Sequence, residues 1–491
     1  MEMIFEGHDY RYAVEQSLLA FFPNERPVYG EEESNRVRVS LTVEGQAGTA
    51  VTELSVEGRT ARGTAQAALS GAEDEYQRER LLQRAVKLSF FEAARALTGV
   101  TPAWGALTGI RPAKLAAGLL EEGKSEEEAD RILRDVYFVS ESRRKLCLPC
   151  AKAGLEAKGD LAENEISLYA GIPFCPTRCA YCSFVSNSVE KSFHLVEPYL
   201  QALLAEADSA AAMVKDLGLK VRSFYMGGGT PTTLTAAQMD RLLGRLREGF
   251  DLADAVELTV EAGRPDTITA EKLAVLRKNG VDRISVNPQS MDDRVLAAIG
   301  RRHSGDDIRK AMELVNAAGF PHVNMDLIAG LPEDTPESFR RTLDEVVAFG
   351  TDNITIHTLS LKKGSRITLE GTRIPTEEEV AAMLDYAAPA LGGAGFAPYY
   401  LYRQRYMSGS FENVGWCRPG GTGWYNIYIM EELHTILSLG AGGSTKMVDQ
   451  PRNRIERVFN LKFPQEYIQR PEKIAANQAA FRAFYQQMTK Q

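Results

Sequence analysis

Between residues 166 and 364 the chain alternates short apolar or β-branched stretches with longer segments that carry one apolar face. The short stretches predict six strands, and the longer segments predict the helices between them. Strands joined by helices in this way predict a parallel sheet with right-handed crossovers. Because six units are two short of a closed eightfold barrel, we expect an α/β fold with a partial (β/α)6 barrel and a wide cleft at the carboxyl ends of its strands. The predicted strands are 166–172, 221–226, 256–260, 283–286, 323–328 and 353–358.

The helices between these strands carry their own signals. Apolar residues at 200, 203, 204, 207, 211 and 214 lie on one face of a helix. Thr235 with Gln238 forms a predicted capping box, and Thr335 followed by Pro336 predicts a helix start. Four glycines occupy predicted C-cap positions: Gly218, Gly280, Gly319 and Gly350.

The first 155 residues follow a different pattern. Segments 37–43 and 51–56 alternate like antiparallel strands, and a helix is predicted from about 74 to 97. The run 125–128 reads as a capping box that opens another helix. We therefore predict an N-terminal α+β domain over 1–155, whose role the residue types do not indicate.

After about residue 374 the strand–helix alternation ends. A helix near 377–391 precedes the aromatic run 398–402, a glycine-rich stretch and a helical tail. We predict the barrel domain over 160–370 and a smaller C-terminal domain over 371–491 that covers the substrate at one mouth of the barrel.

Composition narrows the function classes. The 491 residues are 44% hydrophobic and 25% charged, as in soluble globular proteins. The net charge of −9 argues against nucleic acid as the main partner. The start of the sequence has no signal-peptide pattern, and no apolar run approaches a membrane span. The six cysteines are few and clustered, unlike a secreted disulfide framework, so we expect a cytoplasmic protein with reduced thiols.

Half of the cysteines fall in one short loop after the first predicted strand of the barrel. Cys175, Cys179 and Cys182 have the spacing C-x3-C-x2-C. Three thiolates can hold three irons of a cubane cluster and leave the fourth iron open to a small molecule. The alternatives are a zinc site completed by water, for which His194 is the one local candidate ligand, or three packed cysteines.

A glycine run stands at the end of the second predicted strand. Gly227, Gly228 and Gly229 are followed by Thr230 and Pro231. Glycines let the backbone approach a ligand closely, and their amides can meet a carboxylate. A tight turn would explain the run equally well, but its position one unit after the cysteines favours a binding loop.

Polar residues recur at the ends of the other predicted strands. A carboxylate in such a place can hold a ribose diol. Each residue alone can be an ordinary hydrogen-bonded polar group, but a set that converges on one edge predicts a site. The set is Glu261, Asn287, Gln289, Asp326, His357 and Ser360.

The remaining cysteines carry weaker signals. Cys147 and Cys150 form a C-x2-C pair, which can be half a metal site or a redox pair. No second pair lies in the same region, and the segment is helical in pattern, so we interpret this pair as incidental. Cys417, beside Trp416, is most simply a packed thiol.

Together these motifs resemble the radical S-adenosylmethionine (SAM) superfamily through Cys175, Cys179, Tyr181, Cys182 and the run 227–231. More narrowly, the chain resembles the HemZ-type branch of oxygen-independent coproporphyrinogen III oxidases, the coproporphyrinogen dehydrogenases. That resemblance covers nearly the whole chain. It rests on segments 104–112, 169–184, 261–267, 287–290, 324–328, 400–404 and 412–415.

The resemblance implies roles for individual residues. The three cysteines would ligate a 4Fe–4S cluster, and Tyr169, Gly228 and Glu261 match positions that hold SAM. A further set matches positions around a second SAM in the best-known branch, so one or two SAM molecules are implied. This set is Tyr181, Gly229, Thr230, Gln289, Arg301, Asp326 and Ser360.

The implied reaction is oxidative decarboxylation. Reduction of the cluster would give a 5′-deoxyadenosyl radical, which takes a hydrogen from a substrate propionate. Loss of carbon dioxide and one electron then leaves a vinyl group, and two such events convert coproporphyrinogen III to protoporphyrinogen IX. The implied partners are a tetrapyrrole and an electron donor such as flavodoxin or ferredoxin.

Other activities fit related branches: a haem-binding chaperone, and a radical methyltransferase or ring-opening enzyme that acts on a tetrapyrrole. Two positions depart from the wider family pattern. Gly171 replaces a usual histidine, and Ser183-Phe184 replaces an extra cysteine after the cluster motif. Cationic side chains that could pair with substrate propionates, or form ordinary ion pairs, are Arg178, Arg301, Arg403 and Arg405.

Overall fold

The computed structural model describes residues 1–23, 25–30, 33–72, 74–182, 187–360, 373–404 and 408–489. The chain divides into two units, Met1–Leu148 and Pro149–Gln491. In the described part of the chain, no helix combines the length and the apolar character needed to cross a membrane.

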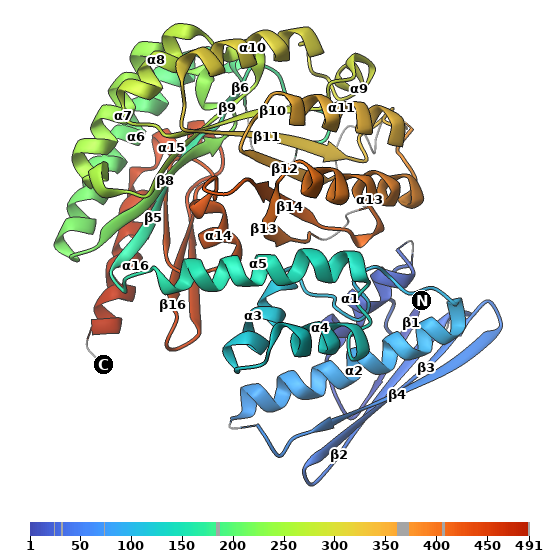
Figure 1. Cartoon of the computed structure of the whole chain (residues 1–491). Coiled ribbons are helices and arrows are strands. Elements are labelled where there is room, and N and C mark those ends of the chain that lie inside the picture. The colour runs from blue at the N-terminus through green and yellow to red at the C-terminus, as the bar shows by residue number, and fades with distance from the viewer. Residues whose placement is uncertain are drawn as a thin grey trace. The chain divides into compact units, whose positions relative to one another are not determined.

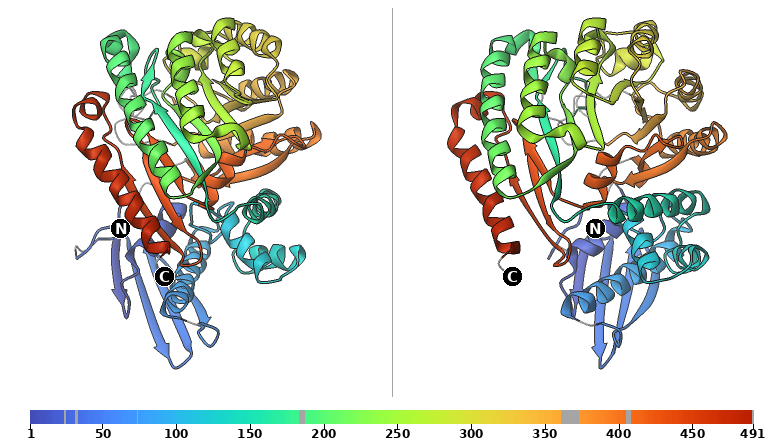
Figure 2. Two further views of the ribbon diagram at one scale, coloured as in Figure 1. Left: turned by 90° about the vertical axis from the view of Figure 1, so that its left-hand side faces the viewer. Right: turned by 60° about the vertical axis from the view of Figure 1, so that its left-hand side comes forward.

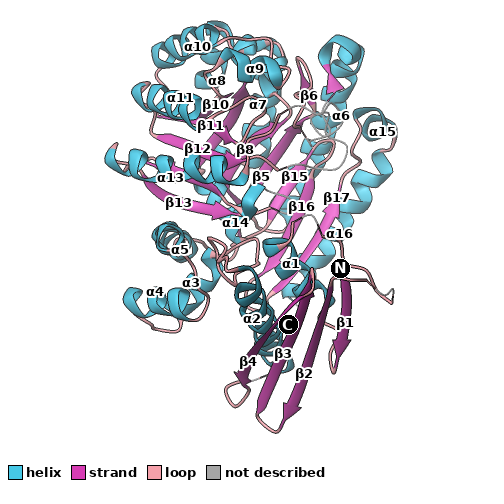
Figure 3. Ribbon diagram, turned by 90° about the vertical axis from the view of Figure 1, so that its right-hand side faces the viewer, coloured by secondary structure: helices cyan, strands magenta, loops and turns pink. Residues whose placement is uncertain are grey.

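The first unit contains a four-stranded sheet with the order β1-β2-β3-β4. β1 and β2 are parallel, and the other two pairs are antiparallel. Figure 3 shows α2 lying across one face of this sheet. The strands are β1 (Glu2–Glu6), β2 (Arg36–Glu44), β3 (Ala47–Val56) and β4 (Arg59–Ala68). The helices are α1 (Arg11–Phe21), α2 (Glu75–Thr98), α3 (Ala113–Glu121), α4 (Glu126–Asp135) and α5 (Glu141–Gly159), which continues into the second unit.

The two strands predicted in this region correspond to β2 and β3, which alternate buried apolar with exposed polar residues. The predicted long helix corresponds to α2, and Ser125 with Glu128 forms the capping box that starts α4. β4 was not predicted, because its sequence is mostly Ala, Arg, Thr and Gln, which have little strand pattern.

The second unit contains an eleven-stranded sheet. Its middle holds the six predicted strands side by side in chain order, all parallel to one another, as the alternation predicts. The described strands do not close into a complete barrel. The six strands are β5 (Glu165–Ile172), β8 (Lys220–Gly228), β9 (Glu257–Gly263), β10 (Arg283–Gln289), β11 (His322–Ala329) and β12 (Asn353–Thr358).

The strand–helix alternation places helices along one face of this sheet (Figure 1). The predicted capping box of Thr235 and Gln238 is present, as is the start at Thr335 and Pro336. The four predicted C-cap glycines all have positive φ. The helices are α6 (Val189–Asp216), α7 (Ala236–Phe250), α8 (Ala270–Lys278), α9 (Asp293–Ala298), α10 (Gly305–Ala318), α11 (Pro336–Ala348) and α13 (Glu377–Gly393).

The central strands have one apolar and one polar face. On β5, Ile166, Leu168, Ala170 and Ile172 alternate with Ser167, Tyr169 and Gly171. The same alternation recurs on β11, where Asn324 and Asp326 stand between buried apolar residues. Because successive side chains of a strand point to opposite faces, the polar residues of neighbouring strands share one face.

Residues 371–491, which the sequence pattern assigns to a smaller C-terminal domain, extend the same sheet at both ends. β15 pairs in parallel with β5, and β14 pairs antiparallel with β12. Without these added strands, the outer edges of β5 and β12 would leave backbone N–H and C=O groups unpaired. The added strands are β13 (Ala397–Tyr402), β14 (Asn413–Cys417), β15 (Ile436–Leu439), β16 (Ser444–Asp449) and β17 (Arg454–Phe459).

The helices of the C-terminal residues pack on different strands of the second unit, α14 on β13 and β8, and α16 on β16 and β17. Figure 2 shows α16 running alongside α6. The helices are α14 (Trp424–Glu431), α15 (Pro464–Gln469) and α16 (Pro471–Thr489). Two short strands, β6 (Phe174–Cys175) and β7 (Asn187–Ser188), flank the predicted cysteine loop.

Candidate functional site

The cysteine loop starts directly after β5, at the carboxyl end of the strand. Cys175, Cys179 and Cys182 are partly exposed, and none forms a disulfide. The other three cysteines of the chain are buried. The alternative of three packed cysteines does not fit this loop, because its three cysteines are partly exposed.

The loop is held at both ends. Thr230 donates its backbone N–H to the Phe174 carbonyl at 2.7 Å, and its hydroxyl lies 3.5 Å from the Cys175 sulfur. At the other end Ala180 donates to the Ile299 carbonyl at 3.0 Å. Hydrogen bonds to a ligand sulfur and a fixed loop are both features of iron–sulfur sites.

The glycine run approaches this loop too closely for side chains. A Cβ added at Gly229 would lie 2.6 Å from the Phe174 carbonyl oxygen, and one at Gly227 would lie 2.9 Å from the Glu261 carboxyl carbon. Gly228 has φ +105°, and its Cβ would lie 3.1 Å from the Tyr169 hydroxyl. A tight turn alone would not impose these contacts. The run brings the backbone against both the cysteine loop and Glu261.

Glu261 stands on β9 beside this backbone. The Tyr225 hydroxyl donates to it at 2.6 Å, and no other donor among the described residues bonds to the carboxylate. Burial raises the pKa of Glu261 to about 7, and nearby Asp326 adds to the rise. The carboxylate therefore retains acceptor capacity at the sheet edge.

Stacked tyrosines adjoin Glu261. The centroid of the Tyr225 ring lies 4.6 Å from that of Tyr425 and 6.2 Å from that of Tyr169, and the ring planes are nearly parallel. Tyr425 comes from α14, outside the predicted barrel, and was not among the predicted site residues. Its signal was limited to an aromatic residue in an apolar helix, which says nothing about a partner two hundred residues away.

Asp326 on β11 joins a polar chain across neighbouring strands. Asn324 donates to the Asp326 carboxylate at 2.8 Å and to the Ser285 hydroxyl at 2.7 Å. His357 Nε2 on β12 lies 3.7 Å from the other Asp326 oxygen. The structure thus brings the predicted residues Asp326 and His357 together, and both influence the Glu261 pKa.

Gln289 ends β10 at an irregularity in the strand register. It is buried with φ +68°, which is costly for a residue with a side chain, and no donor among the described residues reaches its Oε1. Arg301 donates to the Asn287 carbonyl and, at 3.1 Å, to the Tyr181 hydroxyl in the cysteine loop. Gln289 therefore offers a free buried acceptor, whereas Arg301 is engaged with the loop.

Other predicted residues are placed less centrally. Arg178 is exposed on the loop, and His194 is exposed on α6. Arg403 donates to the Ser410 carbonyl at 3.0 Å, and burial lowers its pKa to about 10. Ser360 lies two residues after β12.

Arg405 and Ser183-Phe184 lie outside the described residues. A Cβ at Gly171 would meet nothing closer than 3.5 Å, so the backbone does not by itself demand glycine there. Cys147 and Cys150 are buried on α5, and neither forms a disulfide.

The donor set fits a 4Fe–4S cluster with one open iron. Three cysteines that form no disulfide stand on one anchored loop, with a hydroxyl directed at one sulfur. In the described residues no three His, Cys, Asp or Glu side chains form a group placed to hold a single metal ion. A cubane does not require such a group, because each thiolate binds a different iron.

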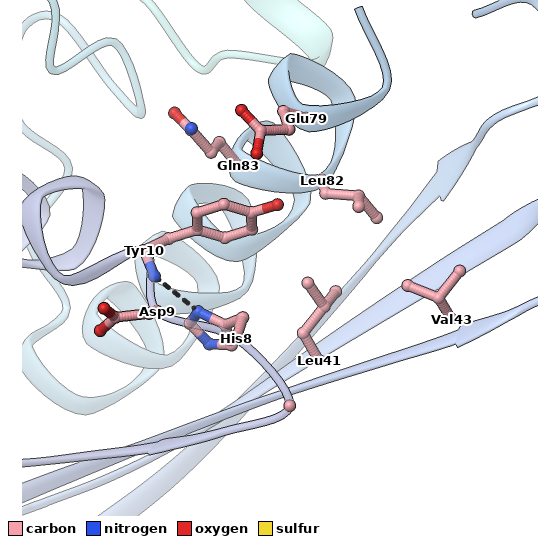
Figure 4. A pocket seen from close by; sticks show the side chains of 9 residues that line it. His8, Asp9, Tyr10, Leu41, Val43, Glu79, Leu82 and Gln83 are labelled. Carbon is pink, nitrogen blue, oxygen red and sulfur yellow. Dashed lines mark hydrogen bonds between the residues drawn. The ribbon is translucent and has the colours of Figure 1, made fainter. Parts of the chain in front are cut away.

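A cavity of about 490 Å³ lies within the first unit and contains none of the predicted site residues. Figure 4 shows its wall, in which the Tyr10 backbone N–H donates to His8 Nδ1 at 3.1 Å beside Glu79 and Leu82. It is unrelated to the cysteine loop, which belongs to the second unit.

Comparison with known proteins agrees with this geometry. Residues 169–346 match the model of the Radical SAM superfamily. The chain is 40% identical over 396 residues to the oxygen-independent coproporphyrinogen-III oxidase-like protein HemZ of Bacillus subtilis, covering 80% of this chain and 79% of that protein.

Two further similarities are shorter. The chain is 34% identical over 270 residues to the haem chaperone HemW of Mycobacterium tuberculosis, covering 54% of this chain and 65% of the relative. The structure resembles coproporphyrinogen III oxidase (HemN) from Escherichia coli, described as a radical SAM enzyme. That match has a TM-score of 0.53 and 25% identity, and covers 66% of this chain and 72% of HemN.

Proposed function

Because the chain belongs to the family of HemZ-type oxygen-independent coproporphyrinogen-III oxidase-like proteins, we propose that it converts two propionate side chains of coproporphyrinogen III to vinyl groups. One observation carries this proposal. The similarity to HemZ runs over 396 residues, far beyond the radical SAM core of 169–346 that many enzymes share. The HemW similarity extends over 270 residues.

Radical SAM proteins use a 4Fe–4S cluster and SAM, and this chain shares those cofactors. When bound, they supply one-electron chemistry that removes a hydrogen atom from the substrate. In the proposal Cys175, Cys179 and Cys182 ligate the cluster. Tyr169, Gly228 and Glu261 hold SAM, with the Glu261 carboxylate accepting from ribose hydroxyls.

A second group of residues lies next to these contacts and is proposed to bind either a second SAM or the substrate. Gln289 offers its unpartnered carbonyl oxygen, and Asp326 with His357 offers a polar pair on the same sheet face. Tyr181 and Arg301 fix the far side of the cysteine loop. Gly229 and Thr230 join that loop to the glycine run.

The substrate would be a tetracarboxylate, which needs cationic partners. Arg178, exposed on the loop, and Arg403 after β13 are the proposed partners among the described residues; Arg403, like Arg301, already donates to a backbone carbonyl. The proposed electron donor is a flavodoxin or ferredoxin, and the proposed location is the cytoplasm. Residues 371–491 are proposed to cover the substrate.

The test is an anaerobic assay with coproporphyrinogen III after cluster reconstitution. The proposal predicts protoporphyrinogen IX together with 5′-deoxyadenosine that depends on the substrate. Cys179→Ala, which removes one cluster ligand, should abolish both products. Absence of both products from the wild-type protein with a full cluster would contradict the proposal.

A haem-transfer function is the second candidate, because HemW-type relatives share the core. It predicts stoichiometric haem binding and haem transfer with no porphyrinogen turnover. A methylated or linearised tetrapyrrole in the same assay would instead indicate a radical methyltransferase or a ring-opening enzyme.

A further inference from the structure

Three segments meet at the carboxyl edge of the sheet in the second unit: the cysteine loop (174–182), the glycine loop (228–233) and a third loop formed by the end of β9 and the residues after it (261–268). The cysteine and glycine loops are joined where Thr230 donates its N–H to the Phe174 carbonyl at 2.7 Å. The glycine loop is joined to the third loop where the Thr232 hydroxyl donates to the Ala262 carbonyl at 2.7 Å.

Arg264 closes this chain of loops into a ring. Its NH1 donates to the Thr177 hydroxyl at 2.6 Å and to the Thr177 carbonyl at 3.3 Å. Its Nε and NH2 donate to the two oxygens of Asp266 at 3.0 and 2.9 Å. The side chain is only 3% exposed. One guanidinium therefore binds three acceptor groups of two residues on two loops, which its planar fork of five donors permits.

Thr177 lies midway between Cys175 and Cys179. The Cys175 end of the loop is held by Thr230, and the Ala180 end is held by Ile299. Between these two anchors, Arg264 supplies the hydrogen bonds that fix the backbone at Thr177. That backbone sets the direction in which the first two cysteines present their sulfurs.

We infer that Arg264 is a positioning residue for the iron–sulfur cluster, which it serves by fixing Thr177 between the first two cysteine ligands. The inference concerns the cluster alone and does not depend on which tetrapyrrole is the substrate.

Lysine cannot replace this residue without loss. An ammonium is a single point that can reach Asp266 or Thr177 with good geometry, but not both in the arginine's planar arrangement. The Arg264→Lys variant therefore keeps the charge and loses the bridge. Thr177→Val removes the hydroxyl acceptor while keeping the side-chain shape, so it tests the same contact from the other loop.

A matched control comes from the amino ends of the strands. Arg283 begins β10, is also buried, and donates to Asn353 and to the carbonyls of Gly421 (3.2 Å) and Thr422 (2.9 Å). Arg283→Lys removes comparable buried hydrogen bonds without touching the cysteine loop. It should lower the unfolding temperature and leave the cluster unaffected.

The experiment uses the full-length protein purified and reconstituted anaerobically. It measures iron and sulfide per chain, the rate of iron loss to a chelator, and the electron paramagnetic resonance spectrum and midpoint potential of the reduced cluster. We expect Arg264→Lys to lose iron about 10-fold faster than the wild type, with an altered spectrum. Thr177→Val should change the same quantities in the same direction by less.

Coupling between the two positions gives the decisive comparison. If Arg264 acts through Thr177, the double variant loses iron no faster than Arg264→Lys alone. The inference is overturned if Arg264→Lys keeps its iron and spectrum, if the two effects simply add, or if Arg283→Lys releases iron equally fast. If Arg264→Lys fails to fold, Thr177→Val decides alone, and a wild-type rate and spectrum overturn the inference.

Discussion

Two buried glutamates of the second unit have opposite surroundings. Glu206 on α6 accepts from the Gly440 backbone at 2.7 Å, from the Asn460 amide at 2.8 Å and from the Tyr467 hydroxyl. Glu261 on β9 accepts from Tyr225, and from no other donor among the described residues. Burial raises the pKa of both carboxyls above the usual range.

The difference separates a carboxylate with a structural role from one in the proposed SAM-binding site. The three donors to Glu206 come from three segments that follow β15 and β17 or belong to α15, so this carboxylate fastens the C-terminal elements to α6. Glu261 has the same burial cost without that compensation, and its free acceptor capacity faces the glycine run. A buried carboxylate with too few hydrogen-bond donors in the fold indicates that a bound ligand supplies the missing donors.

The largest effect is expected from Glu206→Leu. The substitution leaves three buried donors unpaired and should lower the free energy of unfolding by about 3 kcal/mol or more. Chemical denaturation of the apoprotein measures this loss. The control is Asp208→Asn on the same helix as Glu206. It alters an exposed ion pair with Arg245 of α7 and should leave the denaturation midpoint unchanged. A wild-type denaturation midpoint in Glu206→Leu would contradict the structural role of Glu206.

Glu261→Gln should instead weaken SAM binding without lowering the stability of the fold. The substitution replaces the charged acceptor by a neutral one and should weaken SAM binding by about 10- to 100-fold, as for the loss of hydrogen bonds to a charged group. The denaturation midpoint should stay the same or rise, because a buried charge is removed. Calorimetric titration of SAM into the reconstituted protein checks the affinity. Unchanged SAM affinity would contradict the binding role.

The pH dependence of SAM affinity should differ between the wild type and Glu261→Gln. SAM affinity of the wild type should rise as pH increases through about 7, where Glu261 ionises, and fall by up to about tenfold per pH unit below that value. Glu261→Gln should give a flat profile. Stability has the opposite sign: the folded pKa exceeds 4.5, so the contribution of Glu261 is present at low pH and is lost as pH rises from 4.5 to about 7.

Tyr225→Phe should have the smallest effect. It removes the one hydrogen bond that lowers the Glu261 pKa. The midpoint of the SAM affinity profile should therefore move to higher pH, with a change of a few-fold in affinity at pH 7 and little change well above it. A pH series of SAM titrations measures the shift. A midpoint that moves to lower pH would be inconsistent with this electrostatic account.

Local signals explain what the sequence predicted well. The six central strands, the capping boxes and the cysteine loop depend on neighbouring residues, and the structure contains each of them. Polar strand residues such as Glu261 and Asp326 were recognisable because parallel strands end at one edge of the sheet.

The remaining features depend on partners distant in sequence. β15 has four residues, too few for a periodic signal, and its pairing with β5 spans more than 260 positions. Glu206 did leave a signal, since it lies three residues after Leu203 and four before Ala210 on a buried helix face. Its three donors could not be inferred, because they come from segments whose positions only the folded chain defines.

Counting the products of one anaerobic reaction of the reconstituted protein with coproporphyrinogen III tests the proposed decarboxylation directly. We expect one 5′-deoxyadenosine and one carbon dioxide for each propionate converted to a vinyl group, and none of these products from Cys179→Ala. Haem binding with transfer to an acceptor, and no carbon dioxide from the porphyrinogen, would contradict it.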